Sequence, residues 1–111
     1  MADSDSMLLN DAVKQYCGLA ADDTSFDIIF ESSLGASMLK LRQLGGSFIP
    51  PEKGPYLKLS LADIGADDPG NPVIEYLCLN ARLAYDPPSG AQIMQAIKDE
   101  IAQLEFRLSV N

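Results

Sequence analysis

The sequence predicts an all-α domain, a small bundle of four helices with a long C-terminal helix and a proline-rich central segment. Four stretches carry apolar residues at helical spacing, and glycine, proline or capping residues bound them. The segment between the second and third stretches, SFIPPEKGPYLKLSLADIGADDPG, is instead rich in turn signals. The last stretch is the longest and the most regular.

Length and composition fit a single domain. The chain has 111 residues, of which 47% are hydrophobic, enough for one core. We expect the domain to span residues 7–111, after a flexible, polar N-terminal segment at residues 1–6. No apolar run approaches the roughly 20 residues that cross a membrane, and no signal peptide is visible, so no membrane association is expected.

The first two helices have recognisable ends. MLLNDAVKQYCGL carries apolar residues at helical spacing and should stop at Gly18, since a glycine often follows the last helical residue in the left-handed conformation. Thr24 and Asp27 resemble a capping box that starts the second helix, which should end at a Gly-Gly pair. Gly35, in the middle of that helix, would let a neighbouring helix approach closely.

The central segment contains one strand signal. In YLKLSL, residues 56–61, three leucines alternate with Tyr, Lys and Ser. This alternation predicts a short β-strand, which could form a hairpin with residues 48–49 or pair with a neighbouring subunit.

A proline corner separates the third helix from the fourth. Asn71 should cap the third helix and Pro72 should be its first residue. After the corner, Ser89 and Gln92 form a second capping box, S-x-x-Q, at the start of the fourth helix. We expect the corner to end the third helix and to fix the angle between the two helices. Its residues are Tyr85, Asp86, Pro87 and Pro88.

The fourth helix allows two interpretations. Its apolar residues step by three and four, which makes a heptad seam. The helix could pack on its own bundle, or its far end, Phe106 to Val110, could run beyond the core and meet another chain. Different turns of one helix can do both. The seam residues are Met94, Ile97, Ile101, Leu104 and Leu108.

Catalytic and metal-binding chemistry is not expected. The chain has no histidine, which removes the commonest general base and nearly all zinc-site patterns. Cys17 and Cys78 lie in apolar helical runs and should be buried free thiols, with a disulfide or redox pair as the alternative. No cofactor is predicted. Helix capping and a solvated turn explain the two acidic clusters, Asp22, Asp23 and Asp27, and Asp63, Asp67 and Asp68.

The charge is strongly negative. Sixteen acidic and eight basic residues give a net charge of −8. Such a surface repels the phosphate backbone, and the cations are scattered without forming a basic stripe, so sequence-specific DNA binding is disfavoured. An acidic domain can still lie beside DNA that slides past it.

The order of these motifs resembles the small head–tail connector proteins of tailed bacteriophages, the gp6-like adaptor family. Members typically have a helix that ends in aromatic-Asp-Pro-Pro, here Tyr85 to Pro88, and a long helix that closes with Leu-Glu-aromatic-Arg-Leu, here Leu104 to Leu108. The N-terminal half is similar as well, with a short helix ending in Gly-Leu and a second helix that DDTSFD opens and QLG ends. The resemblance spans roughly residues 7 to 110.

The resemblance implies a structural virion protein and no enzyme. Copies of such an adaptor form a ring, usually a dodecamer, beneath the portal protein in the neck of the virion. The ring extends the DNA channel, through which the genome passes without sequence-specific contacts, and offers a docking surface to a stopper or tail-completion protein. Synthesis would take place in the cytoplasm of the host bacterium.

Two candidate surfaces follow for such a ring, whose head-to-tail contacts need two different faces on each subunit. The first, for a neighbouring subunit or the portal, consists of Phe106, Arg107, Leu108 and Val110. The second, for the stopper, the tail or a neighbour, is the loop with Pro50, Pro51, Lys53, Tyr56 and Lys58.

Two other classes of function stay open from the residues alone. The chain could be a small acidic helical interaction module or regulator outside a virion, which a monomer in every native assembly would favour. An enzyme would require turnover that depends on Asp22, Asp23 or Asp27.

Overall fold

Four α-helices and one short 3₁₀ turn make up the described part of the chain, which comprises residues 7–46, 50–65 and 71–110 of a computed structural model. The described residues form no strand longer than a single bridge, and the predicted all-α class is confirmed. The elements are α1 (Leu9–Cys17), α2 (Asp27–Leu44), η2 (the 3₁₀ turn, Tyr56–Lys58), α3 (Pro72–Tyr85) and α4 (Ala91–Val110).

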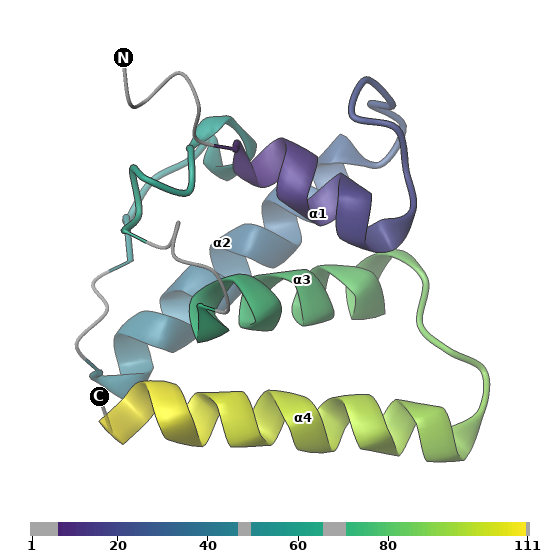
Figure 1. Cartoon of the computed structure of the whole chain (residues 1–111), viewed down its shortest axis with the longest axis vertical. Helices are drawn as coiled ribbons and strands as arrows, with labels where there is room; N and C mark the ends of the chain where they lie inside the picture. Colours follow the sequence, from purple (N-terminus) through teal and green to yellow (C-terminus); the bar gives the residue numbers. More distant parts are fainter. Residues whose placement is uncertain (1–6, 47–49, 66–70, 111) are drawn as a thin grey trace.

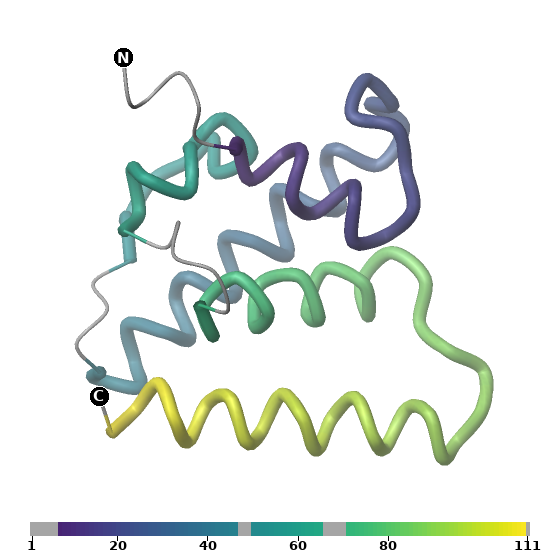
Figure 2. The backbone as a smooth tube through the Cα atoms, in the orientation of Figure 1, coloured from purple at the N-terminus to yellow at the C-terminus, as the bar shows by residue number. Residues whose placement is uncertain are grey.

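Helix α3 lies in the middle of the domain. It packs against α1, α2 and α4, with α2 behind it and α4 antiparallel to it (Figure 1). The backbone trace shows that the connection after α3 reverses the chain, so α3 and α4 form a helical hairpin (Figure 2). The 3₁₀ turn η2 contacts both α1 and α2. This central position explains why the sequence of α3 is apolar on almost every side.

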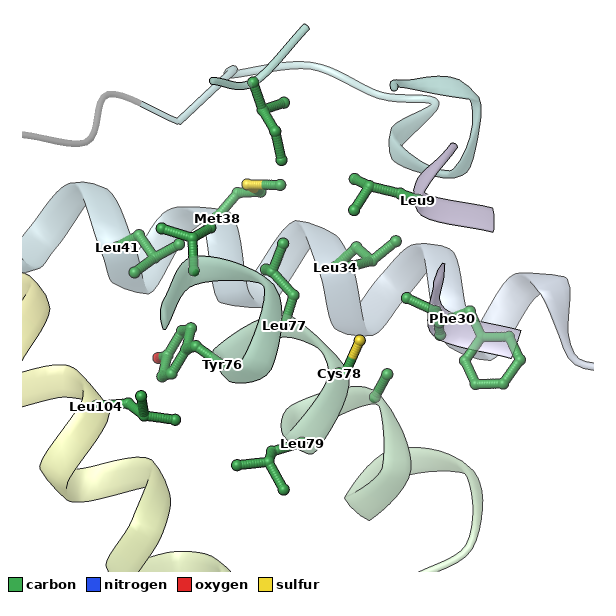
Figure 3. Packing of buried hydrophobic residues seen from close by; sticks show 14 of the residues in the cluster. Leu9, Phe30, Leu34, Met38, Leu41, Tyr76, Leu77, Cys78, Leu79 and Leu104 are labelled. Atoms are coloured by element: carbon green, nitrogen blue, oxygen red, sulfur yellow. The ribbon is translucent and has the colours of Figure 1, made fainter. Parts of the chain in front are cut away.

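The core gathers around α3, with α2 along one side of it and Leu104 of α4 on the other (Figure 3). Helix α1 contributes Leu9 and Val13, which are fully buried. Each large side chain that is fully covered here stabilises the fold by about 1.5–3 kcal/mol. The buried residues of α2 and α3 are Phe30, Leu34, Ser37, Met38 and Leu41, and Val73, Tyr76, Leu77, Cys78, Leu79 and Ala81.

The predicted ends of three helices are confirmed. Gly18 and Gly45 follow α1 and α2 with φ angles of 78° and 74°, the left-handed conformation that glycine adopts without strain. The side-chain oxygen of Asn71 accepts a hydrogen bond of 2.8 Å from the backbone N–H of Val73, and Pro72 is the first residue of α3.

Both predicted capping boxes are wrong. Helix α2 begins only at Asp27, so Thr24 lies outside the capping position, and the carboxylate of Asp27 binds Lys14 instead. At the start of α4 the carbonyl of Gly90 accepts the backbone N–H of Met94, which makes Gly90 the capping residue. Ser89 therefore lies one residue too early to cap the helix. Asp27 pairs with Lys14, which is distant in the sequence, and α4 begins one residue later than a cap at Ser89 requires, so neither capping box forms.

The predicted strand at residues 56–61 is also wrong. Three of these residues form η2, because the carboxylate of Glu31 on α2 accepts the backbone N–H groups of Tyr56 and Leu57, which a 3₁₀ turn leaves without partners. What remains is one antiparallel bridge between Leu8 and Ser60. The hairpin partner proposed at residues 48–49 lies outside the described residues.

Candidate assembly surfaces

The last turns of α4 have a buried face and an exposed face. Leu104 and Leu108 are buried in the core, whereas Phe106 is 69% exposed and Val110 is 64% exposed. Residues 106 and 110 are one helical turn apart, so their side chains share a face. The structure thus places Leu108 inside its own subunit, and the predicted contact surface at this end rests on Phe106, Arg107 and Val110.

The other seam residues of α4 are less completely covered than Leu104. Ile97 and Ile101 are half-buried and pack against the core, and Met94 is also half-buried. Near the C-terminal end, the Tyr76 hydroxyl donates a hydrogen bond of 2.8 Å to Glu105. Burial, together with this carboxylate, raises the pKa of Tyr76 above its ordinary value, so the hydroxyl stays protonated and can donate. The hydrogen bond fastens α4 to α3.

The proline-rich loop is docked onto α2. Its residue Pro50 is buried and Tyr56 is half-buried, while Lys53 and Lys58 are exposed. A Cβ atom on Gly35 would lie 3.3 Å from the Tyr56 ring, so this glycine makes room for an aromatic side chain of η2, and the expected close approach of a helix is wrong. The cationic side chains are the accessible part of this candidate surface.

Glu31 should hold the loop in place, and its replacement should release it. Hydrogen bonds to a charged acceptor contribute about 1.5–3 kcal/mol, and Gln offers one oxygen where the carboxylate has two. We expect Glu31→Gln to lower the free energy of unfolding in urea by about 1–3 kcal/mol and to speed tryptic cleavage after Lys53 and Lys58.

Glu52→Gln is the matched control, because Glu52 is exposed in the same loop. It should change the free energy of unfolding by less than about 0.5 kcal/mol. Equal effects of the two substitutions on stability and on cleavage would contradict the role of Glu31.

The proline corner is anchored by its aromatic residue. The Tyr85 ring packs edge-on against Phe26, with a centroid distance of 4.7 Å, and lies 5.6 Å from Phe30. Helix α3 ends at Tyr85 as predicted, and the backbone N–H of Asp86 donates its hydrogen bond to Arg82. The chain then turns through Pro87, which is exposed, and Pro88, which is half-buried. This corner is therefore the bend of an antiparallel hairpin, held to α2 through aromatic packing.

Three features therefore occur together in this short helical chain. They are a docked proline loop, a corner anchored by an aromatic residue, and a long last helix with an exposed apolar end. The sequence model of a family described as phage connector protein matches residues 8–111. The chain belongs to this family. Comparisons with curated proteins and with solved structures give no match.

Membership makes this connector protein a structural component of a bacteriophage, and it agrees with the resemblance derived from the motifs. Such a role implies assembly with other virion proteins. In the described parts of the chain, no helix combines the length and the apolarity of a membrane span.

A groove at the other end of the connector was not predicted. It has a volume of about 680 Å³ and lies between the start of α1, the first turns of α2 and η2. Its apolar lining consists of Leu8, Ile28, Pro55 and Leu57, and Ile28 is 87% exposed. In the sequence Ile28 lies off the apolar row that runs through Phe26, Phe30 and Leu34, so its exposure was predictable but the groove around it was not.

A buried ion pair was not predicted either. Lys14 of α1 is 1% exposed, and its ammonium lies 2.9 Å from Asp27 of α2. The ammonium also donates to the backbone carbonyl of Ala21 at 3.3 Å. The sequence signal was weak, since Lys14 near the end of a helix is explained equally well by the helix dipole.

Structural roles account for the two cysteines and for Asp23. Cys78 is buried and Cys17 is half-buried, and both are free thiols. Burial raises the pKa of Cys78 to about 12, which makes its thiol unreactive at neutral pH. Asp23 accepts the backbone N–H of Ser25, which lowers its pKa.

The second acidic cluster is only partly described. Asp63 accepts the backbone N–H of Ser60, and the Ser60 hydroxyl accepts the backbone N–H of Asp63 in return, each at 3.0 Å. This reciprocal pair stabilises a turn, as predicted for a solvated acidic loop. Asp67 and Asp68 lie outside the described residues.

Proposed function

We propose that copies of this chain form a ring, a dodecamer, beneath the portal protein in the neck of the virion. The ring extends the DNA channel and offers a docking surface to the stopper or tail-completion protein. The observation that carries the proposal is the exposed apolar end of α4, Phe106 with Val110, in a chain of the phage connector family. Exposed apolar side chains on one face of a helix are typical of a contact with another chain.

The charge of the chain supports a role beside moving DNA. Each copy carries a net charge of −8, and a ring multiplies this charge around its axis. A negative wall repels phosphates, so the genome passes without adhering.

The apolar end of α4 can be tested without unfolding the subunit. Truncation after Leu104 would remove buried Leu108 and the Tyr76–Glu105 hydrogen bond along with the exposed residues. The double substitution Phe106→Ser with Val110→Ser changes only exposed positions. We expect it to leave the circular dichroism of the monomer unchanged and to reduce the joining of heads to tails at least about tenfold, because each large apolar side chain that is fully buried stabilises a contact by about 1.5–3 kcal/mol.

The control carries Leu39→Ser with Ile93→Ser, two residues that are 49% and 57% exposed on α2 and on the first turn of α4. It should complete infectious particles at the normal yield. Normal yield with the Phe106 and Val110 double variant would exclude this end of α4 as an assembly surface. Electron microscopy of particles that places the chain outside the neck would overturn the proposed function itself.

A further inference from the structure

We propose that the groove around Ile28 receives the end of α4 from a second copy of this chain, with Phe106 and Val110 of one subunit seated between α1, α2 and η2 of the next. This inference rests on the proposed ring and identifies the two surfaces that meet in it. The groove and the helix end are different faces of one subunit, as a head-to-tail contact requires.

The shapes of the two surfaces are complementary. The groove is concave, has a volume of about 680 Å³, and presents Leu8, Ile28, Pro55 and Leu57. The end of α4 is the opposite kind of surface, a helix from which two apolar side chains protrude that are 69% and 64% exposed. An amphipathic helix that lays its apolar face in such a groove is a recurrent mode of protein recognition.

Their positions suit a contact between copies. Helix α4 lies at one end of the longest axis of the domain, and α1 with η2 lies at the other end (Figure 1). The domain is 45 Å long in that direction. A subunit that uses both surfaces therefore contacts two different neighbours, one through each end, and the contacts propagate from copy to copy.

Charged side chains at the two surfaces can pair. The lining of the groove contains Glu31, the cation Lys58, and Asp27, whose carboxylate is already paired with Lys14. Arg107 is exposed next to Phe106 on α4. Two chains of charge −8 repel each other overall, so an ion pair between Arg107 of one copy and Glu31 of the next favours this docking over others. This part of the attraction should weaken with added salt.

Other occupants fit the groove less well. The N-terminal segment MADSDS is short, polar and acidic, so it offers little apolar surface to the groove. A second groove borders Ile28 on the side of α3 and α4, but polar groups of Ser32, Lys40, Asn80 and Glu105 line it. An apolar helix end therefore favours the groove of α1, α2 and η2.

Photo-crosslinking tests the contact directly. Phe106 is replaced by the photoreactive residue benzoylphenylalanine, and the protein is irradiated in assembled particles and at high concentration in solution. We expect crosslinks between two copies, from position 106 to peptides that contain Ile28 or residues 55–58. Crosslinks from position 106 to another part of a second copy, to another protein alone, or to nothing would overturn the inference.

A matched pair of substitutions gives a second readout. Ile28→Asp and Ile93→Asp each place an aspartate in the first turn of a helix, at isoleucines that are 87% and 57% exposed. Both should fold normally. In sedimentation, Ile28→Asp should weaken self-association at least about tenfold and Ile93→Asp less than about twofold, and equal effects would contradict the inference.

The two hypotheses can fail separately. Rings in the neck whose crosslinks from position 106 avoid the groove would overturn the inference and leave the proposed function intact. Particles without this chain in the neck would overturn the proposed function, and the solution crosslinks and sedimentation would then decide whether the groove binds a second copy. If the photoreactive chain fails to associate, the comparison of Ile28→Asp with Ile93→Asp decides alone.

Discussion

Leu104→Ala is expected to lower the free energy of unfolding by about 2–5 kcal/mol, the range for large-to-small changes at fully buried sites. Leu104 is 0% exposed and, together with Leu108, places α4 in the core; Figure 3 shows Leu104 beside α3. The substitution leaves a cavity where two helices meet, so α4 should detach at lower urea concentration. Urea denaturation followed by circular dichroism measures the change.

The same helix supplies graded controls. Phe106→Ala, two residues further along, should change the free energy of unfolding by less than about 0.5 kcal/mol, because the Phe106 ring is 69% exposed. Ile101→Ala should fall between the two, since Ile101 is half-buried. If Leu104→Ala cost no more than Phe106→Ala, α4 would not be docked on α3 in the way described.

Asp27→Ala is expected to cost about 3 kcal/mol, the lower end of the range for breaking a buried ion pair. The substitution leaves the Lys14 ammonium buried with only the carbonyl of Ala21 as a partner. The lower end of this range applies because the side chain of Asp27 is 36% exposed, so water can partly take the place of the lost carboxylate. The free energy of unfolding from urea titrations is again the measurement.

A second substitution should rescue the first. Lys14→Met in the Asp27→Ala background removes the unpaired charge and keeps the length of the side chain. We expect this double variant to lie within about 1 kcal/mol of the native protein, because apolar replacements of buried ion pairs are often neutral or stabilising. Failure of the rescue would show that Asp27 acts through the start of α2 and not through Lys14.

The helices were predictable because their signals are local. The left-handed glycine after α1, the Asn71 cap and the proline that ends α3 each act within a few residues of the position that they determine. The segment YLKLSL failed because its conformation is set by Glu31, which lies 25 residues earlier than Tyr56 in the sequence. The alternation of leucines indicates only that one side of the segment is buried. A 3₁₀ turn followed by extended chain can bury Leu57 just as a strand can.

The candidate surfaces were predictable only in part. The apolar end of α4 was visible in the sequence, but its division into buried Leu108 and exposed Phe106 depends on where α2 and α3 meet the helix. The groove beside Ile28 was hidden for a similar reason, since its other walls come from α1 and η2, which are distant from Ile28 in the sequence. The proposed contacts with the portal and the stopper remain predictions, as does the extent of the domain at residues 7–111.

The uneven coverage of α4 divides the helix into two units of different local stability. Its last turns are held by Leu104, Leu108 and the hydrogen bond of Glu105, whereas most side chains between Ala91 and Ala96 are exposed. Local opening costs least where few apolar contacts break, so we expect amide hydrogens of the first turns to exchange through fraying and those near Leu104 to exchange through global unfolding. A partner that binds the first turns of α4 can therefore bend or unwind them, while the buried residues of its last turns keep the domain folded.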